Sequence, residues 1–431
     1  MSESDSTPAG VAVIGAGGAG LLAGIAAAGS GARTVLYERM PKPAKKVAIS
    51  GGGRCNFSNT LEPRAFVREF GDPHVKHLGH ALKVFDNRAL IEMLKKYGVE
   101  GELERHYRLY TSSGRGQDVV DALVKEFLAR GGELITNAHV GQIEADPAGG
   151  FLLRGRFAQR EETRRARTVV VCTGGLSYPQ TGSTGDGYQW ARGTGHAVTP
   201  LRAALVGLRL EEEWPRKLSG TAWPDAACRL WRIEDTPARK PVATERKEML
   251  FTHFGISGPA ILDLSNAYVL AGLDRARLTI DFFPDRSRED LEREILERLQ
   301  SSAHRPPRLA LLGMLPARLL DALEIQVCGT HAPPSQRVTR EQRRALLERF
   351  KQLELTVLGT RGMEWGEVTA GGLDWKDIDP RTMESKRVPG LYFAGEILDL
   401  AGRCGGFNLQ AAFSTGYLAG QSAARQAAGP S

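Results

Sequence analysis

A glycine pattern near the N-terminus is the place in this sequence where residue types and spacing point most clearly to chemistry. Gly15, Gly17 and Gly20 follow the apolar stretch 11–14 with the spacing G-x-G-x-x-G. In a strand–turn–helix unit the first glycine permits the tight turn, the second lets the backbone approach a pyrophosphate, and the third lets the helix pack closely on the strand. The N–H groups at the start of such a helix attract phosphate. The segment therefore predicts a dinucleotide-binding turn.

The residues around this turn complete a strand–helix–strand unit. An apolar helical stretch spans 21–28, a strand spans 34–37, and Glu38 stands at its end, where a carboxylate can accept hydrogen bonds from both hydroxyls of a ribose. Tight packing of an alanine- and glycine-rich helix would give the glycines alone, but the complete context favours a nucleotide. We expect an adenine dinucleotide, NAD or FAD, to contact Gly15, Ala16, Gly17, Gly18, Ala19, Gly20, Glu38 and Arg39.

Two further glycine-rich stretches favour FAD over NAD. Residues 45–56 follow the first unit, whereas 391–396 and 405–410 lie near the C-terminus. A flavin enzyme commonly returns its last strand to the first domain, with an acidic residue at the ribitol and a helix directed at the flavin ring. A helix from Asn408 to about Ala424 would stabilise the negative charge that develops there on reduction. The expected cofactor contacts in these stretches are Lys46, Gly53, Arg54, Cys55, Gly395, Glu396, Gly406, Phe407, Asn408 and Leu409.

The central part of the chain supplies more candidates. A buried strand from 167 ends in Thr173, Gly174 and Gly175, where glycines let the main chain pass close to the cofactor, and the backbone at Val140 could meet the adenine. Tyr178 and His253 are the candidates for proton transfer. A histidine beside aromatic residues is, however, more often a hydrogen-bonded structural residue.

These residues resemble a known group, the BaiN/YhiN-type flavoproteins, which are FAD-dependent oxidoreductases described as aminoacetone oxidase-like. The resemblance rests on 15–38, 49–56, 173–175 with 181–187, 251–259, 368–372, 395–396 and 405–410, in order along the chain. It implies an α/β fold with a split FAD-binding, Rossmann-like domain of the glutathione reductase type, an inserted β-barrel-like domain and a small helical domain. It does not imply one substrate, because members are linked both to amine oxidation and to reduction of unsaturated steroid-like ketones.

Composition changes along the 431 residues predict the domain limits. We expect a disordered tail at 1–10, the FAD-binding domain at 11–195 and 366–425, an inserted β-rich substrate domain at 196–285 and 340–365, and a helical subdomain at 286–339. Five cysteines without a C-x-x-C pair indicate a reducing compartment, and hence a cytoplasmic protein. Cys55 is interpreted either as a reactive thiol or as a small neutral side chain. We expect no metal site, no secretory signal and no membrane span.

Charge gives a weaker indication of partners. Lys and Arg number 57 against 50 Asp and Glu, but arginines such as Arg164, Arg343 and Arg344 are interleaved with acidic residues. This favours a solvated mixed-charge surface over a nucleic-acid partner. The oligomeric state is not predicted.

Three functions stay open. The preferred one is an oxidoreductase that transfers hydride at flavin N5 to or from a small or mid-sized organic substrate, as an NAD(P)H-dependent double-bond reductase or as an amine oxidase. NAD(P)H would bind transiently, because no second G-x-G-x-x-G follows a strand. The alternatives are a flavin-dependent RNA-modifying enzyme and a flavin-binding sensor without turnover.

Overall fold

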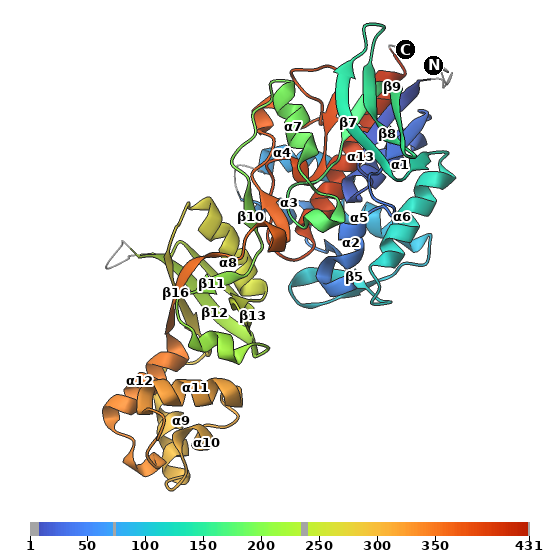
Figure 1. Cartoon of the computed structure of the whole chain (residues 1–431). Coiled ribbons are helices and arrows are strands. Elements are labelled where there is room, and N and C mark those ends of the chain that lie inside the picture. Colours follow the sequence, from blue (N-terminus) through green and yellow to red (C-terminus); the bar gives the residue numbers. More distant parts are fainter. Residues whose placement is uncertain (1–7, 72–74, 234–239, 430–431) are drawn as a thin grey trace. The chain divides into compact units, whose positions relative to one another are not determined.

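The computed structural model describes residues 8–71, 75–233 and 240–429, in two compact units. Unit 1 comprises 1–202 and 367–431, and unit 2 comprises 203–366 (Figure 1). The junctions were expected at about 195 and 365. Residues 1–7 of the expected disordered tail lie outside the described residues, but the limit at 10 was wrong, because strand β1 already begins at Ala9.

A mixed sheet forms the centre of unit 1. Strand β1 (Ala9–Ile14) pairs in parallel with β2 (Thr34–Tyr37) on one side and with β9 (Arg160–Val171) on the other. The other strands are β6 (Glu133–Ile135) beside β2, β18 (Leu391–Phe393) parallel to β9, and β8 (Phe151–Phe157) with β7 (Ala138–Ala145), which continue antiparallel from β9. Val11, Ala12 and Val13 are fully buried, as expected for a central strand covered on both faces. The C-terminal strand thus returns to the N-terminal sheet.

Two helices from opposite ends of the chain pack against each other in unit 1. Helix α1 (Gly18–Gly29) follows β1, and α13 (Phe407–Ala427) is the last element; Figure 1 shows both beside the sheet. A Cβ at Gly416 would lie 2.1 Å from the Ala19 carbonyl oxygen, and one at Gly420 would lie 2.0 Å from that of Ala23. The two backbones are therefore in direct contact, which no larger residue would permit.

The remaining elements of unit 1 surround this core. The helices are α2 (Lys45–Ile49), α3 (Pro63–Arg68), α4 (Val75–Val84), α5 (Asn87–Lys95), α6 (Gln117–Ala129) and α7 (Asp186–Gly193). Strands β3 (Asn56–Asn59), β5 (Arg108–Thr111) and β4 (Gly101–Leu103) form a small antiparallel sheet, and β17 is Val368–Ala370.

Unit 2 contains a closed six-stranded barrel. Its strands, in spatial order, are β11 (Leu208–Leu210), β14 (Gly255–Ser257), β13 (Ala243–Thr252), β12 (Ala222–Arg232), β15 (Ala276–Asp281) and β16 (Leu353–Thr360). Along β12, Cys228 and Leu230 are buried whereas Arg229 and Trp231 are partly exposed, which is the alternation that a barrel requires. Helix α8 (Pro259–Leu270) packs on β13 and β12, and β10 (Arg202–Ala204) spans the unit boundary. The expected β-barrel-like insertion is confirmed.

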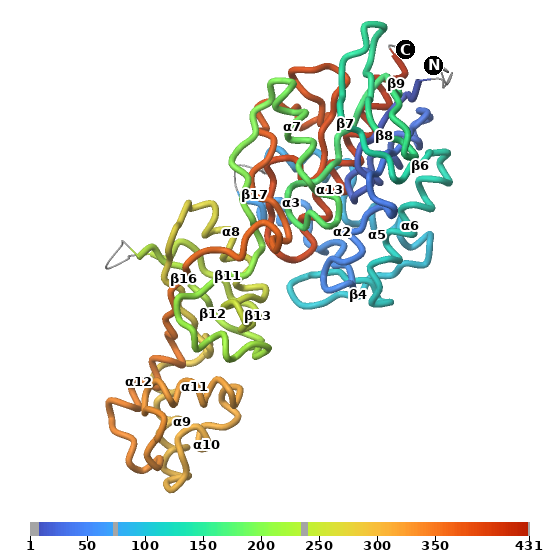
Figure 2. The backbone as a smooth tube through the Cα atoms, viewed as in Figure 1, coloured from blue at the N-terminus to red at the C-terminus, as the bar shows by residue number. Residues whose placement is uncertain are grey.

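Four helices are inserted between β15 and β16. They are α9 (Arg288–Ser301), α10 (Pro307–Ala310), α11 (Ala317–Cys328) and α12 (Arg340–Lys351), and Figure 2 shows them gathered at one end of the barrel. The helical subdomain was expected to end at 339, and this limit was wrong. Thr339 forms a capping box with Gln342 and starts α12, so that the polypeptide stays helical to Lys351.

We predict that Gly420→Ala destabilises the protein by about 2 kcal/mol, because the added methyl group forces α13 away from α1. Gly79→Ala is the control. Gly79 lies inside α4, and a Cβ added there would have no atom within 4 Å, so alanine should stabilise by about 0.5 kcal/mol. Urea denaturation monitored by circular dichroism measures both changes. Equal stability of the two variants would contradict the proposed backbone contact.

Candidate functional site

The glycines of the first turn have separate structural roles. Gly15 has a φ of +96°, and a Cβ there would lie 2.5 Å from the Cys172 carbonyl oxygen; a Cβ at Gly20 would lie 1.8 Å from the Gly15 carbonyl oxygen. Gly17, in contrast, has an ordinary φ of −73° and no atom within 4 Å of a Cβ. Packing thus requires Gly15 and Gly20, whereas Gly17 borders open space at the N-terminus of α1, which has no side-chain cap. A pyrophosphate fits this cradle.

Two backbone hydrogen bonds hold the Glu38 side chain beside the glycine turn. Its Oε2 accepts a hydrogen bond from the Ala16 N–H and its Oε1 from the Met40 N–H, each at 2.8 Å. Burial raises the pKa of this carboxyl, and the two backbone donors oppose that rise. Each oxygen retains acceptor capacity for a ribose hydroxyl. Val140 lies in β7, two residues from Ala138, whose N–H donates to the Glu38 carbonyl at 2.8 Å.

A partly buried ion pair joins the N-terminal and C-terminal parts of unit 1. Lys46 Nζ lies 2.7 Å from Glu396 Oε2 and donates to Ser177 Oγ at 2.6 Å. Glu396 Oε1 accepts from Ser177 Oγ at 2.6 Å and from the Thr369 N–H at 2.9 Å. Burial alone would raise the pKa of Glu396, but the Lys46 ammonium and these hydrogen bonds hold it below its usual value. The carboxylate is therefore charged at neutral pH.

Two partners in this network were not singled out from the sequence. Thr369 Oγ1 accepts from the N–H groups of Leu176 and Ser177, at 2.8 and 3.1 Å. A Cβ at Gly175 would lie 2.2 Å from that oxygen, which explains the glycine. The position of Ser177, two residues after Gly175, was the available signal. The Thr173 hydroxyl beside them is buried without a hydrogen-bond partner in the described protein, so a cofactor atom could satisfy it.

The N-terminus of α13 meets the segment that follows the first unit. Gly406, its N-cap, has a φ of +84°, and a Cβ there would lie 2.2 Å from the Ser58 carbonyl oxygen. Asn59 Nδ2 donates to the Gly405 carbonyl at 3.0 Å, and Ser58 Oγ donates to Gln410 Oε1 at 2.8 Å. The helix start carries no side-chain cap. Together with Lys46 and Glu396, these contacts bring the separate glycine-rich segments together.

Several predicted cofactor residues direct their side chains elsewhere. Phe407 packs on Phe66, with ring centroids 4.9 Å apart. The Asn408 amide bonds to Gly402, accepting at 2.8 Å and donating at 3.0 Å. Phe407 and Asn408 stay predicted cofactor contacts through their main-chain N–H groups at the start of α13. Arg54 pairs with Glu104 at 2.6 Å and lies 4.2 Å from the Tyr110 ring centroid.

Cys55 is a small buried side chain rather than an activated thiol. It is fully buried, and burial raises its pKa to about 11. A thiol in such surroundings carries almost no thiolate at neutral pH. Of the two interpretations of Cys55, the structure favours the neutral one.

The two candidates for proton transfer lie in different units. Tyr178, with a φ of +52°, directly follows Ser177 in unit 1 and begins a short turn, in which Thr181 donates to its carbonyl. His253 lies in unit 2, exposed at the turn between β13 and β14, with its ring 5.1 Å from that of Phe254. Their roles stay predictions.

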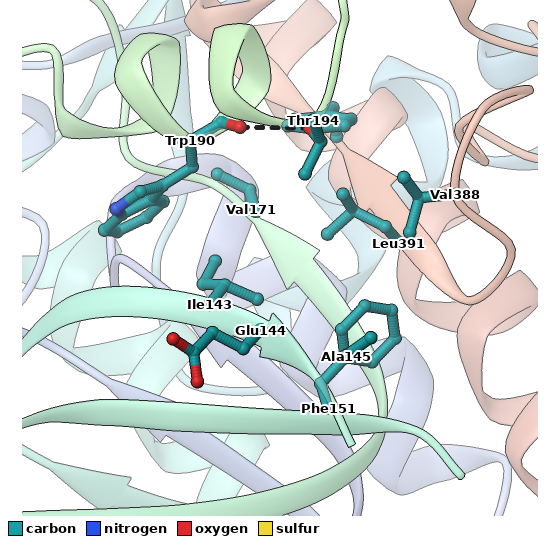
Figure 3. A pocket seen from close by; sticks show the side chains of 10 residues that line it. Ile143, Glu144, Ala145, Phe151, Val171, Trp190, Thr194, Val388 and Leu391 are labelled. Atoms are coloured by element: carbon teal, nitrogen blue, oxygen red, sulfur yellow. Dashed lines mark hydrogen bonds between the residues drawn. The ribbon is translucent and has the colours of Figure 1, made fainter. Parts of the chain in front are cut away.

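A separate cavity of about 160 Å³ lies between the sheet and α7 in unit 1. Ile143, Phe151, Val171 and Trp190 are among its mostly apolar lining residues, as Figure 3 shows. None of the predicted cofactor residues lines it. Over the described ranges, no three His, Cys, Asp or Glu side chains gather as metal ligands, and no helix has the length and apolarity needed to cross a membrane.

The mixed sheet, built from both ends of the chain, with its phosphate-binding turn and returning strand, is that of a Rossmann-type flavoenzyme, an FAD-dependent oxidoreductase. The family is named by a sequence profile: the HI0933-like protein Rossmann domain matches residues 9–422, and the chain belongs to this family. This agrees with the resemblance to BaiN/YhiN-type flavoproteins.

Curated relatives cover nearly the whole chain. The ribosomal RNA dihydrouridine synthase of Haemophilus influenzae is 32% identical over 420 residues, covering 96% of this chain and 98% of the relative. That of Escherichia coli is also 32% identical, covering 95% and 96%. The 3-dehydro-bile acid delta(4,6)-reductase of Clostridium scindens is 30% identical, covering 96% and 99%.

Solved structures confirm the fold. An open-form flavocytochrome c3 fumarate reductase superposes with a TM-score of 0.54 at 16% identity, covering 98% of this chain and 79% of that one. The 3-ketosteroid-delta4-(5alpha)-dehydrogenase of Rhodococcus jostii gives a TM-score of 0.52 at 17% identity, covering 98% and 99%.

We predict that Gly17→Val abolishes FAD retention while the flavin-free protein loses no more than about 1 kcal/mol, because the side chain enters only the open cradle. Gly79→Val is the matched control and should retain FAD. Absorbance of the purified proteins gives the flavin content. A yellow Gly17→Val protein would refute the assigned cradle. Gly18→Ala is unsuitable as a control, because its Cβ would lie 2.7 Å from the Phe413 ring.

We predict that Lys46→Met costs the flavin-free protein about 2 kcal/mol at pH 7, because it leaves the partly buried Glu396 carboxylate without its cation. Since Lys46 lowers the folded-state pKa of Glu396, its stabilisation is present above the unfolded pKa and is lost as the pH falls through the folded pKa. In the variant, the folded-state pKa of Glu396 is no longer lowered by Lys46, so less stability should be lost on acidification. Lys95→Met, which breaks an exposed pair with Glu92, should change stability by less than about 0.5 kcal/mol. Denaturant titrations between acid and neutral pH test this, and identical pH profiles for wild type and Lys46→Met would disprove it.

Proposed function

We propose that this protein reduces a carbon–carbon double bond conjugated to a carbonyl group, and that its substrate is a uracil base in ribosomal RNA. The observation that carries the proposal is the 32% identity, over nearly the full length of both chains, to two ribosomal RNA dihydrouridine synthases. The bile-acid reductase relative supports the same reaction class. Uracil and an unsaturated ketosteroid both contain a double bond that a carbonyl polarises, so that hydride adds to the carbon remote from the carbonyl. A proton completes the reduction at the neighbouring carbon.

Bound FAD, after reduction by NAD(P)H, would supply the hydride for this addition. The residues proposed to hold it are those of the turn at Gly17, Glu38, Thr173, and the N–H groups at the start of α13. Lys46 and Glu396 form an ion pair beside Ser177 whose geometry is fixed before the reaction. The protein would therefore need little reorganisation when charge develops on the reacting groups.

Tyr178 is the proposed proton donor. The segment that carries it is fixed by the hydrogen bonds of Leu176 and Ser177 to Thr369 and by the bond of Ser177 to Glu396. A tyrosine hydroxyl on such a segment can deliver a proton to the second carbon of the double bond. The charge pattern of the sequence disfavoured an RNA-modifying enzyme. The identity to the two dihydrouridine synthases now makes this alternative the preferred function.

A steroid-like enone is the second candidate substrate. It is favoured by the 30% identity to the bile-acid reductase over 96% of this chain. The names of these curated relatives give no support to amine oxidation.

We predict that the purified flavoprotein with NADPH forms dihydrouridine in ribosomal RNA isolated from cells that lack the gene. Nucleoside mass spectrometry detects the product. Tyr178→Phe should lower the rate at least tenfold while NADPH still reduces the flavin, because the proton donor is lost but the cofactor site is not. Tyr97→Phe, at a distant hydrogen bond to Glu126, is the matched control.

A steroid dienone tested in parallel separates the two substrates. Reduction of the dienone without any dihydrouridine would replace the RNA substrate with the small-molecule one. Full activity of Tyr178→Phe would remove the assigned proton donor.

A further inference from the structure

The helical part of unit 2 contains two kinds of arginine. Arg293, Arg298 and Arg308 form ion pairs with Asp290, Glu294 and Glu324, at 2.7, 2.8 and 2.6 Å. Arg288 pairs with Glu348. These pairs cancel most of the positive charge on that part of the helical surface.

Other arginines of this part have no such partner, and four of them lie in neighbouring segments. Arg305, Arg337, Arg340 and Arg344 are exposed, and none of them forms an ion pair with a carboxylate in the part of the chain that the structure describes. Across 303–307 and 334–344, Glu341 is the one acidic residue.

The fold brings these four residues to neighbouring places. The Ser335 N–H donates to the Arg305 carbonyl at 2.8 Å, and the Gln336 N–H donates to the Ala303 carbonyl at 3.0 Å, so the segment of Arg305 lies against that of Arg337. Arg340 and Arg344, one helical turn apart in α12, share a helix face. Since α9 starts just after β15 and α12 ends just before β16, this region lies at the end of the helices away from the barrel (Figure 2).

These four arginines do not contribute to folding stability by their positions. The N-terminal end of a helix carries partial positive charge and favours acidic residues, yet Arg340 and Arg344 lie in the first turns of α12. Unpaired guanidinium groups gathered there also repel one another. An anionic partner would relieve both unfavourable terms, and the guanidinium fork matches a phosphate in charge and geometry.

We propose that Arg305, Arg337, Arg340 and Arg344 form an arginine face that binds the phosphate backbone of RNA. This inference deepens the proposed function and rests on it for the identity of the polyanion. From the sequence, arginines such as Arg343 and Arg344 were interpreted as part of a mixed-charge surface, because acidic residues are interleaved with them. The packing of the two loops makes Arg305 and Arg337 neighbours, although they are far apart in the sequence.

Fluorescence anisotropy with a labelled RNA hairpin, over a range of KCl concentrations, tests the proposal on the full-length flavoprotein. The variant carries Arg305→Gln, Arg337→Gln, Arg340→Gln and Arg344→Gln. It should bind RNA at least tenfold more weakly, and its log–log salt slope should fall by about 3, because roughly four counterions fewer are released. The matched control removes the same charge from arginines that form ion pairs at the surface, with Arg154→Gln, Arg246→Gln, Arg275→Gln and Arg293→Gln. The control should keep a near wild-type slope.

Flavin content and reduction by NADPH should be unchanged in both variants, which shows that unit 1 is intact. Equal RNA affinity and salt slope in the two variants would overturn the arginine face, as would wild-type binding to anionic phospholipid vesicles but not to RNA. Binding is measured without turnover, so the two proposals fail separately. Loss of RNA binding in the variant, with no dihydrouridine formed by the wild type, would support the face and refute the proposed function.

Discussion

The direct backbone contact between α1 and α13 is the constraint on which the rest of unit 1 depends. Glycines at 416 and 420 let the last helix approach Ala19 and Ala23 of the first helix, and β18 adds to β9 in the same closure. This fixes the C-terminal segment against a sheet that was begun at the N-terminus. Lys46 and Glu396, 350 positions apart, consequently meet at 2.7 Å. Without that closure, neither charge would have its ionic partner.

The same closure makes a large insertion possible. The chain leaves unit 1 after 202 and returns at 367, and the intervening residues form a barrel with its own buried core. Because the entropy of closing a loop grows slowly with its length, a folded insertion adds little cost to the return of β18. All predicted cofactor residues accordingly belong to unit 1.

Local patterns predicted the parts of the site that local geometry determines. The turn at Gly15, Gly17 and Gly20 and the acid at Glu38 were predictable, because the role of each depends only on its place within one strand–turn–helix–strand unit. Thr369 was missed, because its role arises only when its hydroxyl meets the 176–177 backbone. Asn408 stays a predicted cofactor contact, but the hydrogen bond of its amide to the Gly402 N–H could not be predicted from spacing. The predicted end of the helical subdomain at 339 was wrong for a related reason. The two prolines before α12 do interrupt the helical structure, but the capping box after them starts a further helix.

The physical problem of a uracil substrate links the two proposals. A base in structured RNA must leave its stack before an enzyme can act on it, at a cost of a few kcal/mol that a free small molecule does not incur. Contacts to the reacting base alone are few, so the energy must come from parts of the substrate that do not react. Phosphates are the most numerous such groups, and their attraction to arginine does not depend on sequence. A cluster of unpaired arginines outside the cofactor unit is thus what an enzyme for RNA would need and what an enzyme for a free enone would not.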